Sequence, residues 1–437
     1  MRLRVKLPLL LTALFATAPV SAADLMQVYR EALANDAQYA AARATAEAGR
    51  EKLPQGLAGL LPIIGVSANT TANNNDYFFG NAQFNSRGYN VNLTQPLFRW
   101  QNFVQYNQSK LLVAQSEANF AQAQQDLILR VAQAYFDVLN AEENLLAVRA
   151  NKTSIVQQLE QAKKNFEVGT ATITDTHEAQ SRFDLAVAQE IAADSDLEVK
   201  RHALRLIVGK DSGELSRLKP QAILAPPQPA SMDQWVDAAE KDSFVVQAQQ
   251  AAAEVAGQEV ERARAGHYPT LDVVANYGDT AAGASQFGPG SYDIVSRNIG
   301  LQLNIPIYQG GLVNSATREA AAHRTASQAL LENARRTAAL GARQSYLGVV
   351  NGIAQVHALE AALVSSQSAL ASNKLGYEVG VRINIDVLNA EQQVYSTQRD
   401  LAKARFDTLL AELRLKATVG ALGEQDLQQV NTLFEAK

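Results

Sequence analysis

The chain contains no cysteine among its 437 residues. This absence excludes a disulfide framework and a lipid-bearing cysteine. Its five histidines are scattered without the spacing of metal ligands, and neither a nucleophile elbow nor a phosphate-binding loop is present. The sequence therefore gives no support to an enzyme, a cofactor or a metal site. The histidines are His177, His202, His267, His323 and His357.

The sequence also lacks an excess of positive charge. Lys and Arg number 39 against 44 Asp and Glu, which gives a formal net charge of −5 at pH 7. Nucleic-acid binding requires clustered Lys and Arg that neutralise phosphates. The mildly acidic composition therefore argues against a nucleic acid as partner.

The first 22 residues have the order of charged and apolar residues found in a secretory signal peptide. Three cations precede an apolar run from Leu7 to Val20, and Ala22 ends a site of small residues. The run is too short to span roughly 30 Å of hydrocarbon, so a membrane anchor is the weaker alternative. We predict cleavage after Ala22 and export of the chain, with a mature formal net charge of −8 because three cations are lost.

After residue 22 no uninterrupted apolar run approaches the length of about 18 residues that a transmembrane helix needs, so we expect none. An exported chain without such a helix is either soluble or enters a membrane through β-strands. The signal of membrane strands is much weaker per segment. Hydropathy alone does not separate these two possibilities.

One phrase occurs twice in the chain. Residues 166–177 read FEVGTATITDTH and residues 377–388 read YEVGVRINIDVL, so that an aromatic residue, Glu-Val-Gly and an aspartate recur 211 positions apart. Tyr135 and Tyr346 keep the same offset, and Pro96 and Pro306 differ by 210. Two copies of this size are too few for a solenoid of short units. We predict a signal peptide at 1–22 and two structural repeats at 23–225 and 226–437, each with a strand pair and a helical hairpin.

Each half contains two long segments that lack helix breakers. Neither Gly nor Pro occurs between Phe98 and Val168, where apolar residues recur at three- and four-residue steps. As one helix, these residues would be roughly 105 Å long. Breaks at Gly169 and at Gly376–Gly380 predict an antiparallel helical hairpin in each half. The predicted helices cover 98–168, 172–208, 312–375 and 381–419, with Gly341, Gly348 and Gly352 interrupting the third.

A simple coiled-coil rod is the alternative to a larger helical assembly. Alanine dominates these segments, and leucine is not confined to strict heptads, which fits a two-stranded seam poorly. Abundant small residues favour helices that pack closely against neighbours on both sides. We therefore predict a many-helix assembly.

Two segments with period-two patterning precede each long helix. Residues 89–97 and 299–307 alternate in polarity, with 63–71 and 270–279 as partners and exposed loops expected at 71–88 and 281–293. The strands are long enough to cross a bilayer when tilted, although a half-buried soluble sheet gives the same alternation. Four strands do not close a barrel, and lipid does not tolerate open edges. If these strands enter a membrane, several chains must pool them.

Five segments resemble the TolC family of outer-membrane efflux and type I secretion channels, also called outer membrane factors. The likeness runs from Asp24 to about Leu427. It implies a mainly α homotrimer whose long coiled-coil hairpins form a periplasmic α-barrel, continuous with a 12-stranded outer-membrane β-barrel to which each chain gives four strands. The residues alone do not fix the number three. The segments are DLMQVYREALAND, LPQGLAGLLP, FEVGTATITD, NIPIYQGGLVNS and YEVGVRINIDVLNA.

The resemblance places both hairpin tips at the periplasmic mouth of a tunnel that is closed at rest. Matched position by position, Thr174 and Asp175 face Tyr377 and Arg382 within and between protomers. These side chains suit a gate latch, because Arg382 can bridge a carboxylate and Tyr377 supplies a phenolic donor. The residues alone favour the alternative that these are ordinary solvated groups at the helix tips.

Two further sets of site residues follow from the same resemblance. Asp386 and Asn389 lie one helical turn apart, where family members can carry two aspartates. A trimer would thus hold one charged ring that attracts cations in its lumen, unless Asp386 only caps or pairs locally. The hairpin tips would form a docking surface for the adaptor. The same residues would form the interhelical turns whether or not an adaptor binds. They comprise Val168, Gly169, Thr170, Val379, Gly380 and Val381.

The function implied is a passive duct with no chemistry of its own. It would export proteins, small toxic compounds or both, opened by a periplasmic adaptor and energised by an inner-membrane ABC or proton-driven exporter. Outer-membrane lipid would surround its strands. One alternative is a duct for drug or metal efflux only. Another is a trimeric coiled-coil surface fibre or adhesin, which would lack paired strands and the duplication.

Overall fold

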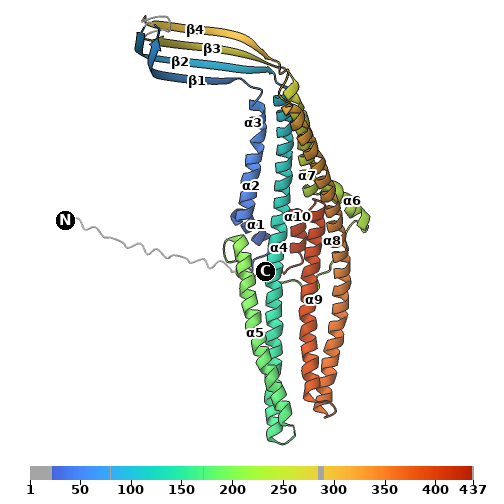
Figure 1. Cartoon of the computed structure of the whole chain (residues 1–437). Helices are drawn as coiled ribbons and strands as arrows, with labels where there is room; N and C mark the ends of the chain where they lie inside the picture. Colours follow the sequence, from blue (N-terminus) through green and yellow to red (C-terminus); the bar gives the residue numbers. More distant parts are fainter. Residues whose placement is uncertain (1–21, 79, 171, 284–289, 436–437) are drawn as a thin grey trace, which may run out of the picture. The chain divides into compact units, whose positions relative to one another are not determined.

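The computed structural model describes residues 22–78, 80–170, 172–283 and 290–435. Apart from Ala22, the predicted signal peptide lies outside the described residues. Figure 1 shows long helices and one sheet. The elements are α1 (Leu25–Asn35), α2 (Ala37–Arg50), α3 (Lys52–Ala58), β1 (Ile63–Tyr77), β2 (Gly80–Phe98), α4 (Trp100–Glu167), α5 (Ile173–Val208), α6 (Met232–Asp242), α7 (Phe244–Arg264), the 3₁₀ turn η1 (Ala265–His267), β3 (Thr270–Ala282), β4 (Tyr292–Asn304), α8 (Leu312–Glu378), α9 (Asn384–Thr418) and α10 (Glu424–Asn431).

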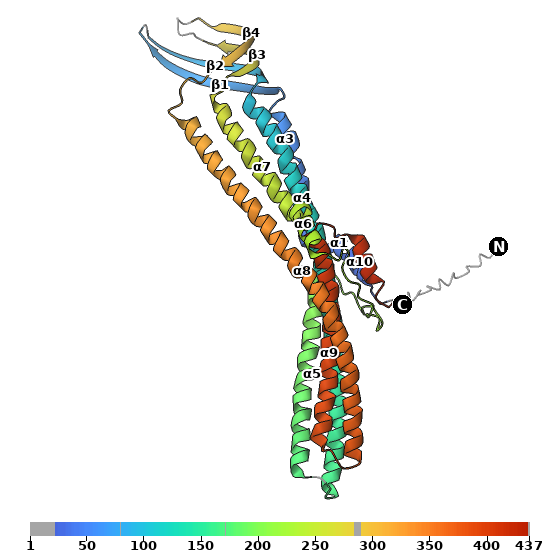
Figure 2. The same cartoon turned by 90° about the vertical axis from the view of Figure 1, so that its right-hand side faces the viewer.

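The four long helices form where helix breakers are absent. α4 has 68 residues and α8 has 67, so each is roughly 100 Å long. Their ends lie within a few residues of the predicted ones because the glycines that follow adopt positive φ, which a helix interior does not allow. α8 and α9 lie side by side (Figure 2), and the prediction of helical hairpins is confirmed.

The predicted interruption of the third long helix is wrong. α8 runs unbroken through Gly341, Gly348 and Gly352. A Cβ on Gly352 would collide with the Thr408 hydroxyl, whereas a Cβ on Gly348 would lie 3.5 Å from the Ala411 Cβ. Gly352 is therefore required by the close approach of α8 and α9, and tertiary packing overrides its poor helix propensity.

The chain divides into two compact units. Unit 1 comprises Met1–Ala34, Val131–Ile223 and Gln425–Lys437, and unit 2 comprises Asn35–Arg130 and Leu224–Glu424. This division follows compactness, whereas the predicted repeats at 23–225 and 226–437 follow the duplication and stay a prediction.

Unit 1 is organised around Tyr135, whose side chain is fully buried. Its hydroxyl donates to the carbonyl oxygens of Ala23 at 3.2 Å and Ser216 at 3.0 Å. Its ring meets the Phe434 ring edge-on, with centroids 5.6 Å apart. Burial raises the pKa of Tyr135 well above its ordinary value. The phenol is thus a permanent donor that ties two non-helical segments to α4.

The duplicated tyrosine has a matching role in unit 2. The Tyr346 hydroxyl donates to the Ala230 carbonyl oxygen at 2.6 Å. Trp235 of α6 packs nearby in a buried cluster with residues of α8 and α9, among them Val349 and Leu415. Tyr135 on α4 and Tyr346 on α8 therefore each hold an irregular segment through the hydroxyl group.

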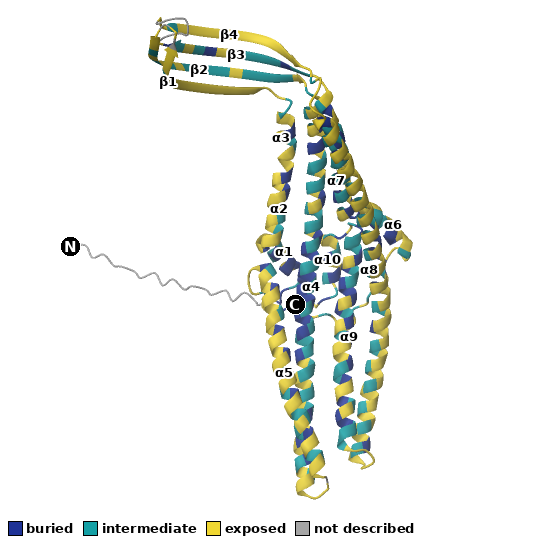
Figure 3. Ribbon diagram, in the orientation of Figure 1, coloured by how far each residue is buried: buried dark blue, intermediate teal, exposed yellow. Residues whose placement is uncertain are grey.

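The four strands form one antiparallel sheet in the order β1-β2-β3-β4. The strand pairs predicted within each half are present, and β2 pairs with β3. Edge strands β1 and β4 are largely exposed (Figure 3). Neither pairs along its outer edge with another described strand of the chain. Each edge therefore presents backbone N–H and C=O groups for a further strand.

The predicted loops between the strands are largely wrong. β1 extends to Tyr77 and β2 begins at Gly80, so most of 71–88 is a regular hairpin, paired from Ile63–Thr94 to Tyr77–Gly80. Asparagine-rich sequence obscured this because its polarity is typical of loops. Part of 281–293 is also strand, and residues 284–289 lie outside the described part. β4 ends at Asn304 rather than 307, since Pro306 has no N–H to donate.

The sheet sorts its residues by face, because directly paired residues share a face. One side, here called the aliphatic face, carries the exposed side chains of Ile64, Val66, Ile299, Leu301 and Leu303. The other side carries mainly Asn, Gln, Ser, Thr and Gly. An apolar face that is exposed together with a polar one is typical of membrane strands around a watery lumen.

An ion pair fastens the sheet to the start of α4. Arg99, between β2 and α4, donates from Nε and one Nη to both carboxylate oxygens of Asp272 in β3, at 2.7 and 2.6 Å. Asp272 is buried. Two parallel hydrogen bonds fix the orientation of the Arg99 guanidinium relative to the Asp272 carboxylate as well as the distance between them.

One helix bears on the expectation that no transmembrane helix follows residue 22. By length and composition alone, α8 contains a window apolar enough to cross a membrane, with a mean hydropathy of 1.4 and 11% of the window buried. A single such helix is weak evidence of a membrane span, and α8 packs against both α7 and α9. The test therefore does not assign α8 to lipid.

The contact at Gly352 gives a stability prediction. Gly352→Ala should destabilise the protein by about 1–3 kcal/mol, because the new methyl group overpacks the α8–α9 contact. Gly348→Ala on the same helix should be neutral or slightly stabilising. Thermal unfolding in detergent measures both. Adding Thr408→Ala should restore most of the loss, and equal melting temperatures for the two alanine variants would contradict the assignment.

Candidate functional site at the hairpin tips

The turn of the first hairpin follows directly from its sequence. Gly169 has φ +76°, and its N–H donates to the Phe166 carbonyl at 3.0 Å. The N–H of Thr170 donates to the Asn165 carbonyl at 2.8 Å. This pair of bonds is the Schellman motif, which satisfies the last carbonyls of a helix and needs a left-handed residue.

The second hairpin repeats this motif atom for atom. Gly380 has φ +81°, and its N–H donates to the Tyr377 carbonyl at 3.1 Å. The N–H of Val381 donates to the Gly376 carbonyl at 2.9 Å. The duplicated aromatic-Glu-Val-Gly phrase thus forms the same type of helix C-terminus in both hairpins. The predicted role of both glycines in the turns is confirmed.

The duplicated aspartates have different local partners. Asp175 belongs to a capping box with Thr172: its N–H donates to the Thr172 hydroxyl oxygen at 3.3 Å, and its Oδ2 accepts from the Thr172 N–H at 2.9 Å. Such caps satisfy free N–H groups at a helix N-terminus. Thr174 is exposed beside it in the first turn of α5.

In the second hairpin Ile383 stands at the capping position and offers no side-chain acceptor. Asp386 instead lies 3.5 Å from Arg382, measured from Oδ2 to Nη1. The Arg382 side chain is 58% exposed, so this pair contributes only about 0–1 kcal/mol. Each aspartate of the duplicated phrase is therefore engaged within its own hairpin.

The remaining predicted site residues are accessible to different degrees. Asn389 is exposed, whereas Asp386 and Tyr377 are half-buried. The apolar tips are open to solvent, with Val168 71%, Val379 64% and Val381 76% exposed. The latch would join Thr174 and Asp175 of unit 1 to residues of unit 2 and of other protomers, and it stays a prediction.

Sequence reasoning missed one strong interaction near the second tip. The Glu391 side chain is only 2% exposed, and its Oε1 lies 2.8 Å from Lys374 Nζ on the facing helix. The offset of 211 places Lys163 and Gln180 at the matching positions of the first hairpin, where Lys163 pairs with Glu160 at 3.2 Å. Lysine is kept at the first of these positions in both copies, whereas Glu391 replaces the neutral Gln180, and this change of charge is the trace that the pair leaves in the sequence.

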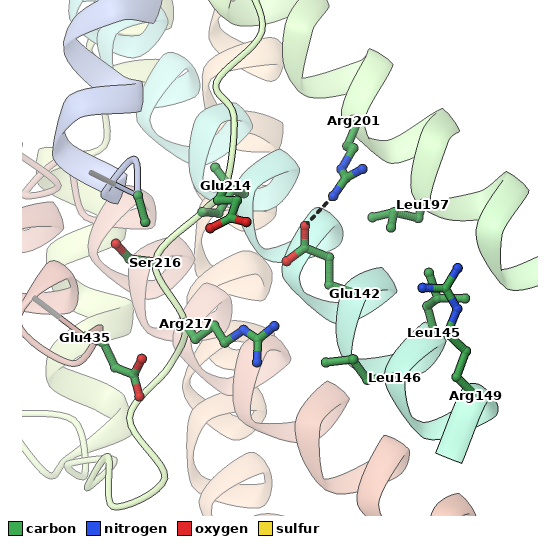
Figure 4. A pocket seen from close by; sticks show the side chains of 12 residues that line it. Glu142, Leu145, Leu146, Arg149, Leu197, Arg201, Glu214, Ser216, Arg217 and Glu435 are labelled. Atoms are coloured by element: carbon green, nitrogen blue, oxygen red, sulfur yellow. Dashed lines mark hydrogen bonds and ion pairs between the residues drawn. The ribbon is translucent and has the colours of Figure 1, made fainter. Parts of the chain in front are cut away.

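Unit 1 also contains a pocket of about 410 Å³ (Figure 4). Its walls combine leucines of α4 and α5 with arginines and glutamates, and Arg201 bridges to Glu142 at 3.0 Å. Ser216 is the only hydroxyl-bearing residue among its described lining residues, and no histidine joins it there. The lining thus offers no nucleophile with a paired histidine base.

Metal binding finds little support in the described part of the chain. No group of three or more His, Asp and Glu side chains converges there to hold an ion.

The family model described as Outer membrane efflux protein matches residues 28–210 and again residues 235–421. The chain belongs to this family. The double match spans most of each predicted repeat.

Individual relatives agree with this membership. The outer membrane protein TolC of Vibrio cholerae serotype O1 is 33% identical over 429 residues, covering 97% of each chain. The alkaline protease secretion protein AprF of Pseudomonas aeruginosa is 32% identical, covering 94% of this chain and 88% of its own.

The fold has a close counterpart among solved structures. The CmeC outer membrane channel of Campylobacter jejuni superposes with a TM-score of 0.80 at 18% identity, covering 94% of this chain and 90% of its own. The predicted resemblance, fold class and outer-membrane location are confirmed. The chain is an outer-membrane channel protein with helices of the periplasmic tunnel type and four antiparallel strands.

The buried ion pair generates a test on this chain. Lys374→Met should destabilise the protein by about 2 kcal/mol, because it removes the cation that faces the buried Glu391 carboxylate. The effect is smaller than for a fully buried pair because the Lys374 side chain is 50% exposed. Lys163→Met is the matched control in the first hairpin, and it should cost no more than about 1 kcal/mol because its partner is exposed. Thermal unfolding in detergent compares them. Similar shifts for both variants would show that Glu391 does not depend on Lys374.

Proposed function

We propose that the chain forms a homotrimeric outer-membrane duct for the passive export of proteins, small toxic compounds or both. The observation that carries the proposal is the four-stranded sheet, which is apolar on one face, polar on the other and open at both edges. Three such sheets joined edge to edge would satisfy every edge group and close a 12-stranded barrel. Relatives described as TolC and as a protease secretion protein support export through the duct.

The same proposal includes the organisation of the chain. After a signal peptide at 1–22, the repeats at 23–225 and 226–437 would each give one strand pair and one hairpin. Each protomer would thus supply two similar hairpins to a tunnel wall with three-fold symmetry. No enzymatic step is assigned, since the polar groups described above are engaged in caps and ion pairs.

Partners of the duct would engage the hairpin tips. Val168, Val379 and Val381 expose apolar side chains beside Gly169 and Gly380, a combination suited to the hairpin tips of a periplasmic adaptor. Energy would come from an inner-membrane ABC or proton-driven exporter. A duct restricted to drug or metal efflux shares this geometry, and export of a protease in a reconstituted system separates the two.

The basic test is reconstitution of the purified mature protein. Native mass spectrometry should give three times the mass of one mature chain, and planar bilayers should show discrete channels. A monomer, or a preparation without conductance, would contradict the duct.

The gate latch would hold the periplasmic mouth closed. Arg382→Ser and Tyr377→Phe each remove donors to Asp175 and Thr174, so single-channel conductance should rise severalfold, most in the double variant. Tyr395→Phe makes the same chemical change as Tyr377→Phe, but within α9 rather than at the tip, and serves as the control. Unchanged conductance in the double variant, at equal protein levels, would exclude the latch.

Asp386 would form a ring of three carboxylates in the lumen that attracts cations, and multivalent cations most. Block by a trivalent cation added from the periplasmic side should vanish in Asp386→Ala and tighten in Asn389→Asp. Arg382→Ser should also tighten it, because Asp386 then loses its local cation. Blocking affinity in planar bilayers measures this. An affinity that is the same in all three variants as in the wild type would remove the ring from the mechanism.

A further inference from the structure

The charged residues of the sheet are confined to one region. Among the described strand residues, Asp272 lies on the polar face, where Arg99 neutralises it. All other charged strand residues lie on the aliphatic face, at the end nearer the hairpin turns. They are Asp76, Arg87, Asp279, Asp293 and Arg297.

The aliphatic face is therefore zoned along its strands. Ile299, Leu301 and Leu303 occupy the half of β4 next to the helices, and Arg297 follows directly toward the turn end. In β2, Leu93 is followed in the same direction by Tyr89 and Arg87 on that face. Apolar bands flanked by aromatic girdles mark the depth at which membrane strands meet lipid headgroups.

Two tyrosines lie level with charged residues of this zone, Tyr277 paired with Arg297 and Tyr89 with Asp279. The Arg297 guanidinium stands over the Tyr277 ring, 5.5 Å from its centroid. Tyr277 in turn contacts Tyr89, with ring centroids 6.2 Å apart. This arrangement holds Arg297 on an aromatic base while its N–H groups still point to the surroundings, since the side chain is exposed.

The arginines of this zone lack carboxylate partners in the described part of the chain. No Asp or Glu forms an ion pair within 4.0 Å with Arg87 or Arg297 there. Asp279 interacts with the carboxyl group of Asp293 and also, through charge, with Arg87, which forms no ion pair within 4.0 Å. Two exposed guanidinium groups that no carboxylate bridges, at headgroup depth on a lipid-facing surface, match the geometry of phosphate groups.

We propose that Arg87 and Arg297, flanked by Tyr89 and Tyr277, bind the phosphate groups of outer-leaflet lipids. The proposal rests on the outer-membrane function proposed above, because the periplasmic helices set the turn end of the sheet in the outer leaflet. Each lipid phosphate would accept hydrogen bonds from one arginine that no carboxylate bridges. In a trimer this surface would recur three times around the barrel.

Native mass spectrometry of the detergent-purified protein, titrated with diphosphoryl lipid A, tests the site. Each arginine should strengthen binding about fivefold, so Arg87→Gln with Arg297→Gln should weaken it by more than tenfold. Arg343→Gln on α8 removes the same charge away from the sheet and should change nothing. Arg87→Lys with Arg297→Lys keeps the charge but not the planar fork of donors, so it should bind more weakly than wild type and more tightly than the double glutamine variant.

Two comparisons identify the ligand and separate this proposal from the duct itself. Lipid A without phosphates should bind wild type and double glutamine variant equally, and inorganic phosphate should not displace the lipid. Displacement by inorganic phosphate, or equal binding of diphosphoryl lipid A to wild type and double variant, would overturn the site. Channel formation in bilayers without lipid A tests the duct alone, and the double variant should still conduct.

Discussion

The need of every backbone N–H and C=O for a partner is the constraint on which this structure depends. One chain provides four paired strands and two open edges, and lipid offers nothing that could satisfy those edges. Under the proposed function, other copies of the chain would complete the sheet. Four helices adjoin the sheet, since α3 and α7 end shortly before β1 and β3 and α4 and α8 begin shortly after β2 and β4. Arg99 fastens the start of α4 to Asp272.

The duplicated phrase shows how the same residues can acquire different roles. Both copies end a long helix with the same Schellman motif, because Gly169 and Gly380 alone accept a positive φ there without strain. After the turn the copies diverge. Thr172 engages Asp175 in a cap, whereas Ile383 leaves Asp386 to Arg382. A tunnel mouth built from such hairpins would alternate capped and ion-paired ends, which differ in their dependence on salt.

The charged zone of the aliphatic face lies toward the turn end of the sheet, where the proposed membrane position places lipid headgroups. Under the proposed function, side chains that face lipid tails are aliphatic, and tyrosine, arginine and aspartate follow toward the turn end. In the described chain no carboxylate lies within 4.0 Å of the Arg87 or Arg297 guanidinium, although Asp279 interacts with Arg87 through charge. The order of residue types along one face of the sheet would thus follow the depth of each residue in the bilayer.

The sequence by itself determined the four long helices, the duplication, the strand pairs and the turn glycines. These features depend on the helix or strand propensity of the residues and on the period of the hydrophobic pattern, both of which can be read within a single segment. Tertiary structure decided the rest. Helix α8 continues through Gly352 because its packing against α9 outweighs the poor helix propensity of glycine, and the nearby Thr408 leaves no room for a Cβ there. The asparagine-rich hairpin is strand because its backbone groups pair across the sheet. The buried contact between Glu391 and Lys374 joins residues on two helices, and no spacing along one helix reveals which charges will face each other in a packed interior.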